Sequence, residues 1–397
     1  MISNGCPSPS SPRSAPPSST SLRELALLFA RLGATAFGGP AAHIAMMRDD
    51  VVNRRQWLTE ERFLDLLGAT NLIPGPNSTE LALHIGWERR RLPGLLVAGV
   101  AFIVPAMLVT GALGWAYVRF GTRPSAGWLL YGVKPVILSV VAQAIWGLLP
   151  RAARNRPLSA IGALAALLSA FGVHELLVLL GAGLCAVALA RARSRRASPP
   201  GVLALLPGLP LAASAKLSVV SLPNLFWVFF KTGSVLFGSG YVLLAFLRAD
   251  LVERLHWLSP AQLIDAIAVG QVTPGPVFTT ATFIGYVIAG PGGALAATAG
   301  IFLPAFFFVA ISGPLIPRLR SSATAAAFLD GVNVGSLALM AVVTVQLGRA
   351  AIIDLPALGL ALTSAVLLLR FKLNSAWLVF GGAAAGYALH ALGLGAA

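Results

Sequence analysis

A succession of long apolar segments, joined by short loops, decides what this chain of 397 residues can fold into. Only 11% of the residues are charged and 57% are hydrophobic, whereas about one quarter of the residues in soluble domains are charged. A helix of about 20 apolar residues crosses the hydrocarbon core of a bilayer. The sequence therefore predicts an all-α polytopic membrane protein. The candidate spans are about 22–47, 60–87, 92–119, 126–149, 157–172, 174–190, 222–247, 260–289, 292–317, 323–347, 355–370 and 375–396.

The positive charge of the chain is placed between these segments. The formal net charge is +15, which in a soluble protein would suggest nucleic acid as a partner. Most of the arginines, however, lie between apolar segments, where basic residues set membrane topology and contact anionic lipids. We therefore expect the lipid bilayer, and no nucleic acid, as a partner.

The cysteines and histidines form no metal or cofactor motif. Cys6 and Cys185 are too few for a disulfide framework or a cysteine-based metal site. The five histidines show no HExxH-type spacing. We expect neither a metal site nor a cofactor.

Two stretches interrupt the apolar pattern. Residues 1–21 are rich in serine and proline and lack an apolar core, which predicts a disordered tail rather than a cleaved signal peptide. Residues 191–221 begin with a basic run and are predicted to form a linker. Within this linker, 201–213 (GVLALLPGLPLAA) is short and broken by prolines, so the sequence leaves open whether it crosses the membrane.

The chain consists of two related halves. Residues 29–86 align with residues 229–286 without a gap. The match resumes near Gly132 and Gly331, and we assign 22–190 and 222–397 to two repeats, a common plan for secondary transporters. Low complexity does not explain the match, because the identical residues include rare types. These are Arg48, Asp50, Trp57 and Asp65, each with its partner 200 positions later.

The basic loops suggest that the two repeats run in opposite senses. Basic clusters follow the second, fourth and sixth segments of the first half, but the first, third and fifth segments of the second half. If basic loops are cytoplasmic, the repeats have an inverted topology. Arg48, Arg54 and Arg55 contradict this pattern, because they follow the first segment of the first half.

Two motifs predict broken helices in each repeat. Phe37-Gly38-Gly39-Pro40 corresponds to Phe237-Gly238-Ser239-Gly240, and Pro74-Gly75-Pro76 corresponds to Pro274-Gly275-Pro276. Two prolines around a glycine cannot continue a helix, and Asn77 or Ser78 could cap the helix that restarts. A restarted helix directs free N–H groups and its positive dipole end at a cavity, which suits an anion. The alternative is that glycine and proline only kink packed helices.

Charged residues within the apolar segments are further candidates. Lys134, whose repeat partner is Asn333, lies deepest by residue count. A cation in the middle of a membrane helix costs about 2.5–3.5 kcal/mol, so it normally faces a cavity or a partner. Arg31 and Lys231 form one pair of repeat partners, and Asp65 and Asp265 form another. The acids either form structural ion pairs with these cations or carry protons.

Three more titratable residues lie close to the breaks of the first repeat. Glu80 and His84 are one helical turn apart after Pro74-Gly75-Pro76, and His43 follows the first glycine pair. None has a repeat partner of the same type. A histidine can titrate near neutral pH, although a single membrane histidine more often makes a packing hydrogen bond.

Several of these motifs resemble the chromate ion transporter family, in its long-chain form with two domains. They are Thr35-Ala36-Phe37-Gly38-Gly39-Pro40 with His43, Asn71 to Glu80 (NLIPGPNSTE), Tyr131-Gly132-Val133-Lys134-Pro135 and Gly270 to Val277 (GQVTPGPV). The resemblance covers about residues 22–396. It implies a bacterial inner-membrane protein that exports chromate, driven by the proton gradient, and confers chromate resistance. It also implies two homologous domains in opposite orientations.

The resemblance and the motifs together select two sets of residues. A tetrahedral dianion needs at least one desolvated cation and several helix N-termini to replace its water. Candidates for holding the substrate are Lys134, Gly38, Gly39, Gly75, Asn77, Ser78, Thr79, Gly238, Gly240, Gly275, Thr279 and Asn333. Candidates for charge or proton coupling are Arg31, Lys231, Asp65, Asp265, Glu80, His84 and His43.

Other functions remain open at this point. Sulfate or another small anion would suit the same residues as chromate. A membrane enzyme acting on lipid phosphates would need paired acids or a metal cluster. Asp49-Asp50 is the only acidic doublet in a loop, and it has no DDxxD-type continuation. Sparse acids argue against a cation transporter, and a potassium-type channel filter is missing from the sequence. The sequence leaves a homodimer open.

Overall fold

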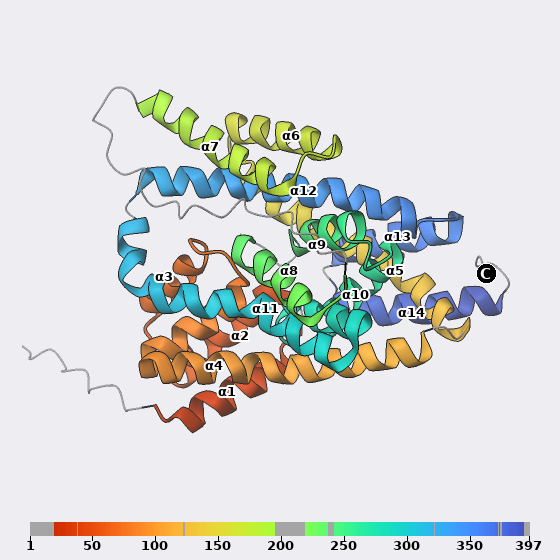
Figure 1. Ribbon diagram of the computed structural model, residues 1–397, viewed down its shortest axis with the longest axis horizontal. Coiled ribbons are helices and arrows are strands. Elements are labelled where there is room, and N and C mark those ends of the chain that lie inside the picture. Colours follow the sequence, from red (N-terminus) through yellow and green to blue (C-terminus); the bar gives the residue numbers. More distant parts are fainter. Residues whose placement is uncertain are drawn as a thin grey trace, which may run out of the picture.

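A computed structural model describes residues 20–37, 39–121, 124–194, 219–236, 242–320, 322–371, 373 and 375–392, and its secondary structure in these ranges is helical (Figure 1). The first repeat contains α1 (Leu22–Thr35), α2 (Gly39–Arg48), the π-helical turn η1 (Asp49–Arg54), α3 (Glu60–Thr70), α4 (Asn77–Phe120), α5 (Pro124–Ala152), α6 (Arg156–Ala170) and α7 (Glu175–Ser194). The second repeat contains α8 (Leu222–Val235), α9 (Leu243–Leu247), the π-helical turn η3 (Arg248–Arg254), α10 (Pro260–Val272), the 3₁₀ turn η4 (Val277–Thr279), α11 (Thr280–Arg320), α12 (Ala323–Ala351), α13 (Leu355–Phe371) and α14 (Ser375–Ala391). Residues 1–19 of the predicted tail, the 201–213 segment, Gly38, Gly238 and Gly240 lie outside the described residues. The tail was predicted two residues too long, because Ser21 caps α1 and Thr20 accepts a hydrogen bond from Arg89.

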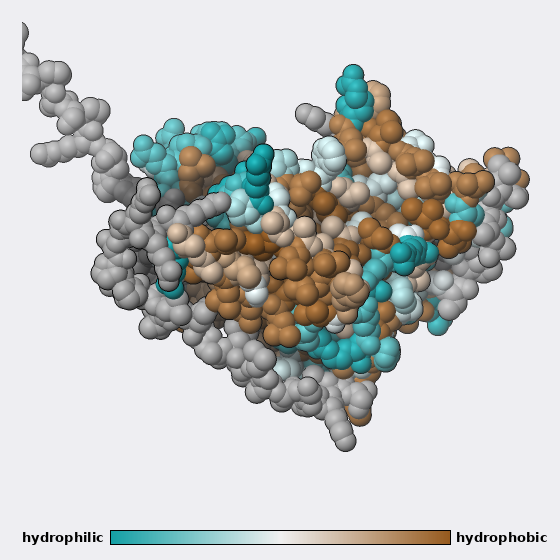
Figure 2. Space-filling view, turned by 90° about the horizontal axis from the view of Figure 1, so that it is seen from above, coloured by the Kyte–Doolittle hydropathy of each residue, from teal (hydrophilic) through white to brown (hydrophobic). Residues whose placement is uncertain are grey.

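The helices suit a bilayer in length and in surface. Among the described residues, five helical stretches are long and apolar enough to cross a membrane. Large apolar side chains are exposed along them, among them Leu108, Trp115, Trp146 and Phe307. Figure 2 shows apolar residues covering a broad area of one face of the molecule. The prediction of an all-α polytopic membrane protein with broken helices is confirmed.

The first predicted span of each repeat folds back on itself. Arg31 on α1 forms an ion pair with Asp50 beyond α2, at 2.5 Å between its guanidinium nitrogen and Oδ2. In a straight helix two residues so placed would be about 28 Å apart. Lys231 and Asp250 make the equivalent contact in the second repeat, at 2.6 Å. Because the chain breaks between α1 and α2, 22–47 is a hairpin and not a single crossing.

The second predicted span is also a hairpin. Arg62 at the start of α3 pairs with Glu88, far along α4, at 2.9 Å. The next residue, Arg89, donates hydrogen bonds to the hydroxyl of Thr20 and to the carbonyl of Trp57. The open ends of both hairpins of the first repeat therefore lie together. The expectation that 60–87 crosses the membrane is wrong, because Pro74-Gly75-Pro76 turns the chain back halfway.

α4 and α11 each contain a sharp turn. In α4 the backbone leaves helical geometry at Arg90 and Arg91, and a Cβ atom on Gly86 would lie 2.3 Å from the carbonyl oxygen of Gly94. Eight residues of straight helix would separate these two glycines by about 12 Å, so the chain reverses between them. α11 reverses in the same way at Ala289 and Gly290. Each helix thus has a short arm before its turn and a long arm after it.

The long arms of α4 and α11 run in opposite directions. Gly99, soon after the turn of α4, faces Phe306, which lies far beyond the turn of α11. Gly114, near the end of α4, faces Tyr286 on the short arm of α11. Figure 1 shows the same opposition of the two helices. We call the two ends of the molecule the Arg90 end and the Gly290 end, after the turns that lie there.

The outer helices of each repeat pack on the other repeat. α6 and α7 pack on α12, and α13 and α14 pack on α5 (Figure 1). A Cβ atom on Gly132 of α5 would lie 1.9 Å from the carbonyl oxygen of Gly382 on α14. Its repeat partner Gly331 on α12 meets Ala182 of α7 in the same way, at 2.3 Å. Small residues at these crossings let helix backbones touch and interlock the two repeats.

We predict that Gly132→Leu lowers the stability of the protein in detergent. A leucine side chain would have to push α5 away from α14, and overpacking of this kind costs about 1–3 kcal/mol. The melting temperature of the purified protein measures the effect. Gly147→Leu on the same helix is the control, since a Cβ atom there meets nothing within 4 Å. Equal melting temperatures for the two variants would contradict the packing described for Gly132.

Candidate functional site

The four helix breaks meet at the centre of the molecule, and we call this meeting point the crossing. The N–H of Gly75 donates a hydrogen bond to the carbonyl of Leu236 at 2.8 Å, and the N–H of Gly275 donates to the carbonyl of Ala36 at 2.9 Å. Ala36 and Leu236 are the residues at which α1 and α8 end. The Pro-Gly-Pro turn of each repeat is therefore bonded to the first break of the other repeat.

Both central glycines are required by this geometry. Gly75 and Gly275 have φ values of +142° and +85°, which side chains rarely tolerate. A Cβ atom on Gly275 would lie 2.6 Å from the carbonyl oxygen of Gly33 and 2.7 Å from the Cβ of Ala106. Gly75 and Gly275 are buried. Interrupted backbone at this depth is tolerated because protein, and not lipid, surrounds it.

Polar side chains of the first repeat gather at the crossing. His43 lies 3.0 Å through Nε2 from the carbonyl oxygen of Ala36, which already accepts from Gly275. Since Nε2 donates there, Nδ1 of the neutral ring accepts from the hydroxyl of Ser78, at 3.3 Å. Both side chains are buried. His43 thereby ties α2 to the start of α4 and to the second repeat.

The start of α4 differs from the expectation that Asn77 or Ser78 caps it. The residue at the cap position is Pro76, which makes no side-chain cap. Asn77 is already helical, and its side-chain amide Nδ2 donates to Oδ1 of Asn71 at 3.0 Å. In the part of the chain that the structure describes, no side chain therefore caps the first N–H groups of α4, because proline precedes the helix directly.

Glu80 is buried without a hydrogen-bond partner among the described residues. Both of its carboxyl oxygens are enclosed, and Oε1 lies 2.3 Å from the position that a Cβ atom on Gly75 would take. Leaving a buried polar group unsatisfied costs about 1–3 kcal/mol, more for a charged group. Three more buried atoms nearby lack partners in the described part of the chain. They are Oδ1 of Asn77, Oγ1 of Thr79 and Nε2 of His84.

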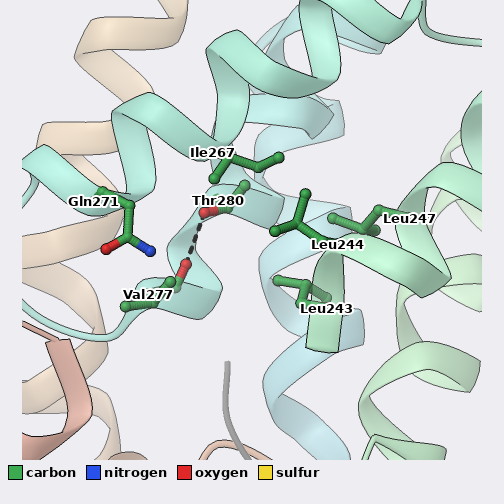
Figure 3. Close-up of a pocket in the computed structure, with 7 residues that line it drawn as sticks. All are labelled: Leu243, Leu244, Leu247, Ile267, Gln271, Val277 and Thr280. Carbon is green, nitrogen blue, oxygen red and sulfur yellow. Dashed lines mark hydrogen bonds between the residues drawn. The ribbon is translucent and has the colours of Figure 1, made fainter. Parts of the chain in front are cut away.

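The equivalent place in the second repeat is an apolar cavity (Figure 3). Its volume is about 10 Å³, room for a single water molecule. Thr280 donates to the carbonyl of Val277 there, at 2.8 Å, and Thr279 donates to the carbonyl of Pro276. In the alignment of the two repeats, Leu243 corresponds to His43 and Val277 corresponds to Asn77. The cavity is lined by Leu243, Leu244, Leu247, Ile267, Gln271, Val277 and Thr280.

Lys134 lies apart from the crossing. Its Nζ is 3.6 Å from Oδ1 of Asp265 on α10, and the hydroxyl of Tyr117 donates to Oδ2 of the same carboxylate at 2.8 Å. Asp265 precedes Pro274 by about 13 Å of helix. Tyr117 lies beyond Ala106 along α4, towards the Gly290 end. The Lys134–Asp265–Tyr117 cluster thus joins the two repeats on the Gly290 side of the crossing.

The remaining charged candidates lie elsewhere. Arg31 and Lys231 pair with Asp50 and Asp250, and so they close hairpins instead of facing a cavity. Asp65 is half-buried on α3, within electrostatic range of Arg62, and Asn333 is half-buried on α12. The sequence analysis noted Asp50 and Asp250 only as identical repeat partners and missed these ion pairs. Their presence in both repeats was the available signal.

Comparison with known proteins identifies the family. Residues 23–187 and again residues 223–387 match the family model described as chromate transporter. The chain belongs to the chromate transporter family. The duplicated match confirms the two repeats, and the family makes the protein a transporter rather than an enzyme.

Relatives of similar length support this membership of the chromate transporter family. The chromate transport protein of Cupriavidus metallidurans is 36% identical over 91% of this chain and 92% of its own length. The chromate transport protein of Pseudomonas aeruginosa is 31% identical over 94% of this chain and 93% of its own. A probable chromate transport protein of Synechococcus elongatus is 30% identical over 85% of this chain and 87% of its own. No solved structure matches the chain.

Proposed function

We propose that this protein is a secondary transporter that exports chromate across the bacterial inner membrane, driven by the proton gradient, and so confers chromate resistance. The observation that carries the proposal is the crossing, where two Pro-Gly-Pro turns and the ends of α1 and α8 meet inside the protein. Broken helices whose ends meet midway through the membrane are how secondary transporters bind ions. The identity of the proposed substrate, chromate, comes from the names of the relatives.

The crossing offers an oxyanion free N–H groups at helix starts, followed by a cation. The uncapped first turn of α4 presents Asn77, Ser78 and Thr79, and η4 presents Thr279 in the second repeat. Lys134 lies farther along, towards the Gly290 end. We propose that the anion is held first at the crossing and then meets Lys134, where it competes with the Asp265 carboxylate. The cavity of the second repeat beside the crossing, at about 10 Å³, is too small for a tetrahedral oxyanion, so loading through it requires the hairpins to separate.

The arrangement of charge supports an inverted topology with the Arg90 end in the cytoplasm. α5 returns from the Gly290 end to Arg154, whose ion pair with Asp330 places it beside the start of α12. The Arg90 end carries the greater number of arginines, as the positive-inside rule requires of the cytoplasmic side. Among the described residues, the arginines of the Arg90 end include Arg23, Arg48, Arg54, Arg55, Arg62, Arg89, Arg90, Arg91, Arg151, Arg154 and Arg156, and those of the Gly290 end include Arg119, Arg248, Arg254 and Arg349.

Cysteine labelling tests this orientation. Glu61 and Ala261 are exposed repeat partners, at the starts of α3 and α10. In a chain whose Cys6 and Cys185 are replaced by serine, we expect a membrane-impermeant maleimide to label Ala261→Cys in intact cells and Glu61→Cys only after the cells are opened. Labelling of both positions from the same side would contradict the inverted topology.

Flux measurements test the transport itself. The full-length protein, reconstituted into vesicles, is expected to move labelled chromate, and a pH gradient is expected to accelerate this movement. Sulfate added in excess separates a chromate-selective protein from a general oxyanion transporter, and an excess of a metal cation serves as the control. Chromate movement that equals that of protein-free vesicles would overturn the proposal.

A further inference from the structure

Three titratable side chains form a row along the short arm of α4. Glu80, His84 and Glu88 are spaced four residues apart and therefore lie on one side of the helix, about 6 Å of rise from one to the next. The short arm begins at the crossing and ends at the turn of Arg90. The row therefore leads from the centre of the protein to the Arg90 end.

The row passes from a buried end to an exposed end. The side chains of Glu80 and His84 are buried, whereas that of Glu88 is 31% exposed and pairs with Arg62 at 2.9 Å. His84 is within electrostatic range of both Arg62 and Glu88. Among the described residues, Arg62 on α3 is the charged group of another element that pairs with Glu88 and acts on His84. His43 on α2 contacts Ser78 at the start of the same helix, and Asp65 on α3 is within electrostatic range of Arg62.

Two members of the row have free hydrogen-bonding capacity where a proton would be transferred. Neither carboxyl oxygen of Glu80 has a partner in the described part of the chain, and neither does Nε2 of His84. Buried polar groups are nearly always hydrogen-bonded, so a buried carboxyl group without a partner points to a functional role. One water molecule spans the gap between side chains one helical turn apart.

The second repeat has no such row. The stretch from Val277 to Ile288, which follows its Pro-Gly-Pro turn, contains neither a carboxylate nor a histidine. The equivalent position is the apolar cavity of Figure 3. A pathway built on the row therefore connects the crossing with one end of the molecule only.

We infer that Glu80 is the site of the coupled proton and exchanges it with solution at the Arg90 end through His84 and Glu88. Protonated Glu80 gives its proton to Nε2 of His84 and becomes a carboxylate. The imidazolium then gives one proton to Glu88 or to water at the Arg90 end and returns to its neutral form. This inference rests on the proposed function, because it assigns the coupling ion of that transport to one repeat.

Two assays on vesicles that contain the full-length protein separate coupling from transport. One follows exchange of labelled for unlabelled chromate without a pH gradient, which needs no net proton movement. The other follows the internal pH when a chromate gradient is imposed. For Glu80→Gln we expect exchange within about twofold of the unmodified protein and proton movement at least about a hundredfold slower, as loss of a general acid–base group produces.

His84→Gln and Glu88→Gln test the pathway. We expect His84→Gln to slow proton movement about as strongly as Glu80→Gln, with exchange preserved. Glu88→Gln should shift the dependence of the rate on the pH at the Arg90 end and leave its dependence on the pH at the other end unchanged. Ser336→Ala is the control, since its hydroxyl is also buried without a partner among the described residues but lies on α12.

The outcomes distinguish this inference from the proposed function. Normal proton movement in Glu80→Gln, or loss of exchange together with proton movement, would overturn the assignment of Glu80 as the proton site. Exchange without any proton movement in the unmodified protein would also overturn it, yet would leave chromate transport standing. Absence of exchange in the unmodified protein would reject the proposed function itself.

Discussion

Replacing Gly275 by alanine will reduce chromate transport by more than about tenfold, a factor that about 1.4 kcal/mol already produces. The new Cβ atom would lie 2.6 Å from the backbone oxygen of Gly33, and backbone cannot move aside as the end of a side chain can. The positive φ of Gly275 adds strain. The Pro-Gly-Pro turn would have to leave Ala36, so the crossing would open. Chromate flux into vesicles, normalised to the amount of protein, measures the effect.

Gly172 supplies the matched control for Gly275. It has a φ of +80°, close to that of Gly275, but a Cβ atom on Gly172 meets nothing within 4 Å. Gly172→Ala therefore introduces the same backbone strain without the clash, and we expect near-normal transport. If Gly275→Ala and Gly172→Ala transported chromate equally well, the contact between Gly275 and the end of α1 would have no functional importance.

Replacing Lys134 by glutamine will have the second large effect. Among the described residues, Asp265 would keep only the hydroxyl of Tyr117 as a partner, and breaking a buried ion pair costs about 3–5 kcal/mol. We expect both a lower melting temperature and loss of chromate transport. The double variant Lys134→Gln with Asp265→Asn removes both charges, so it should regain stability while transport stays lost.

The double variant separates the two roles of Lys134. Normal chromate flux in it would contradict the proposal that the ammonium group binds the anion, and would leave the ion pair a purely structural role. Lys231→Gln is the control within the same class of interaction. Its partner Asp250 retains Arg254 at 2.6 Å, so we expect a smaller loss of stability and preserved transport.

The helix breaks could be predicted from sequence because they depend on local backbone chemistry. Two prolines around Gly75 or Gly275 exclude a continuous helix in any surroundings. The duplication of these motifs then indicated that both repeats use them in the same way. The sequence analysis selected residues of these breaks together with Lys134 as candidates for holding the substrate. The bonds of Gly75 to Leu236 and of Gly275 to Ala36 join the breaks, whereas Lys134 lies apart from them beside Asp265.

The hairpins could not be predicted from hydropathy. A broken apolar segment has the same composition whether it continues across the membrane or folds back, and only the partners of its charged residues distinguish the two cases. Arg31 forms an ion pair with Asp50, and Arg62 forms one with Glu88, because the chain reverses between the two residues of each pair. This reversal places Arg48, Arg54 and Arg55 at the Arg90 end beside Arg89. The equivalent reversal in the second repeat places Arg248 and Arg254 at the Gly290 end, opposite to the side that the loop-charge count gave them.

The packing of the outer helices was also beyond the sequence. Gly132 and Gly331 form a repeated pair in the sequence, but nothing in the pattern shows that each contacts a helix of the other repeat. The same limit applies to Lys134, whose partner Asp265 belongs to the other repeat. Contacts between repeats depend on the tertiary arrangement, which residue spacing within one repeat does not encode.

The most direct test of the crossing as the anion site is to locate bound chromate in crystals of the full-length protein by the anomalous scattering of chromium. We predict a chromium peak between the Pro-Gly-Pro turns, at a position from which the chromate oxygens accept hydrogen bonds from the N–H groups at the start of α4. A fully occupied peak elsewhere, with none at the crossing, would contradict the proposal that the interrupted helices of the two repeats hold the transported anion.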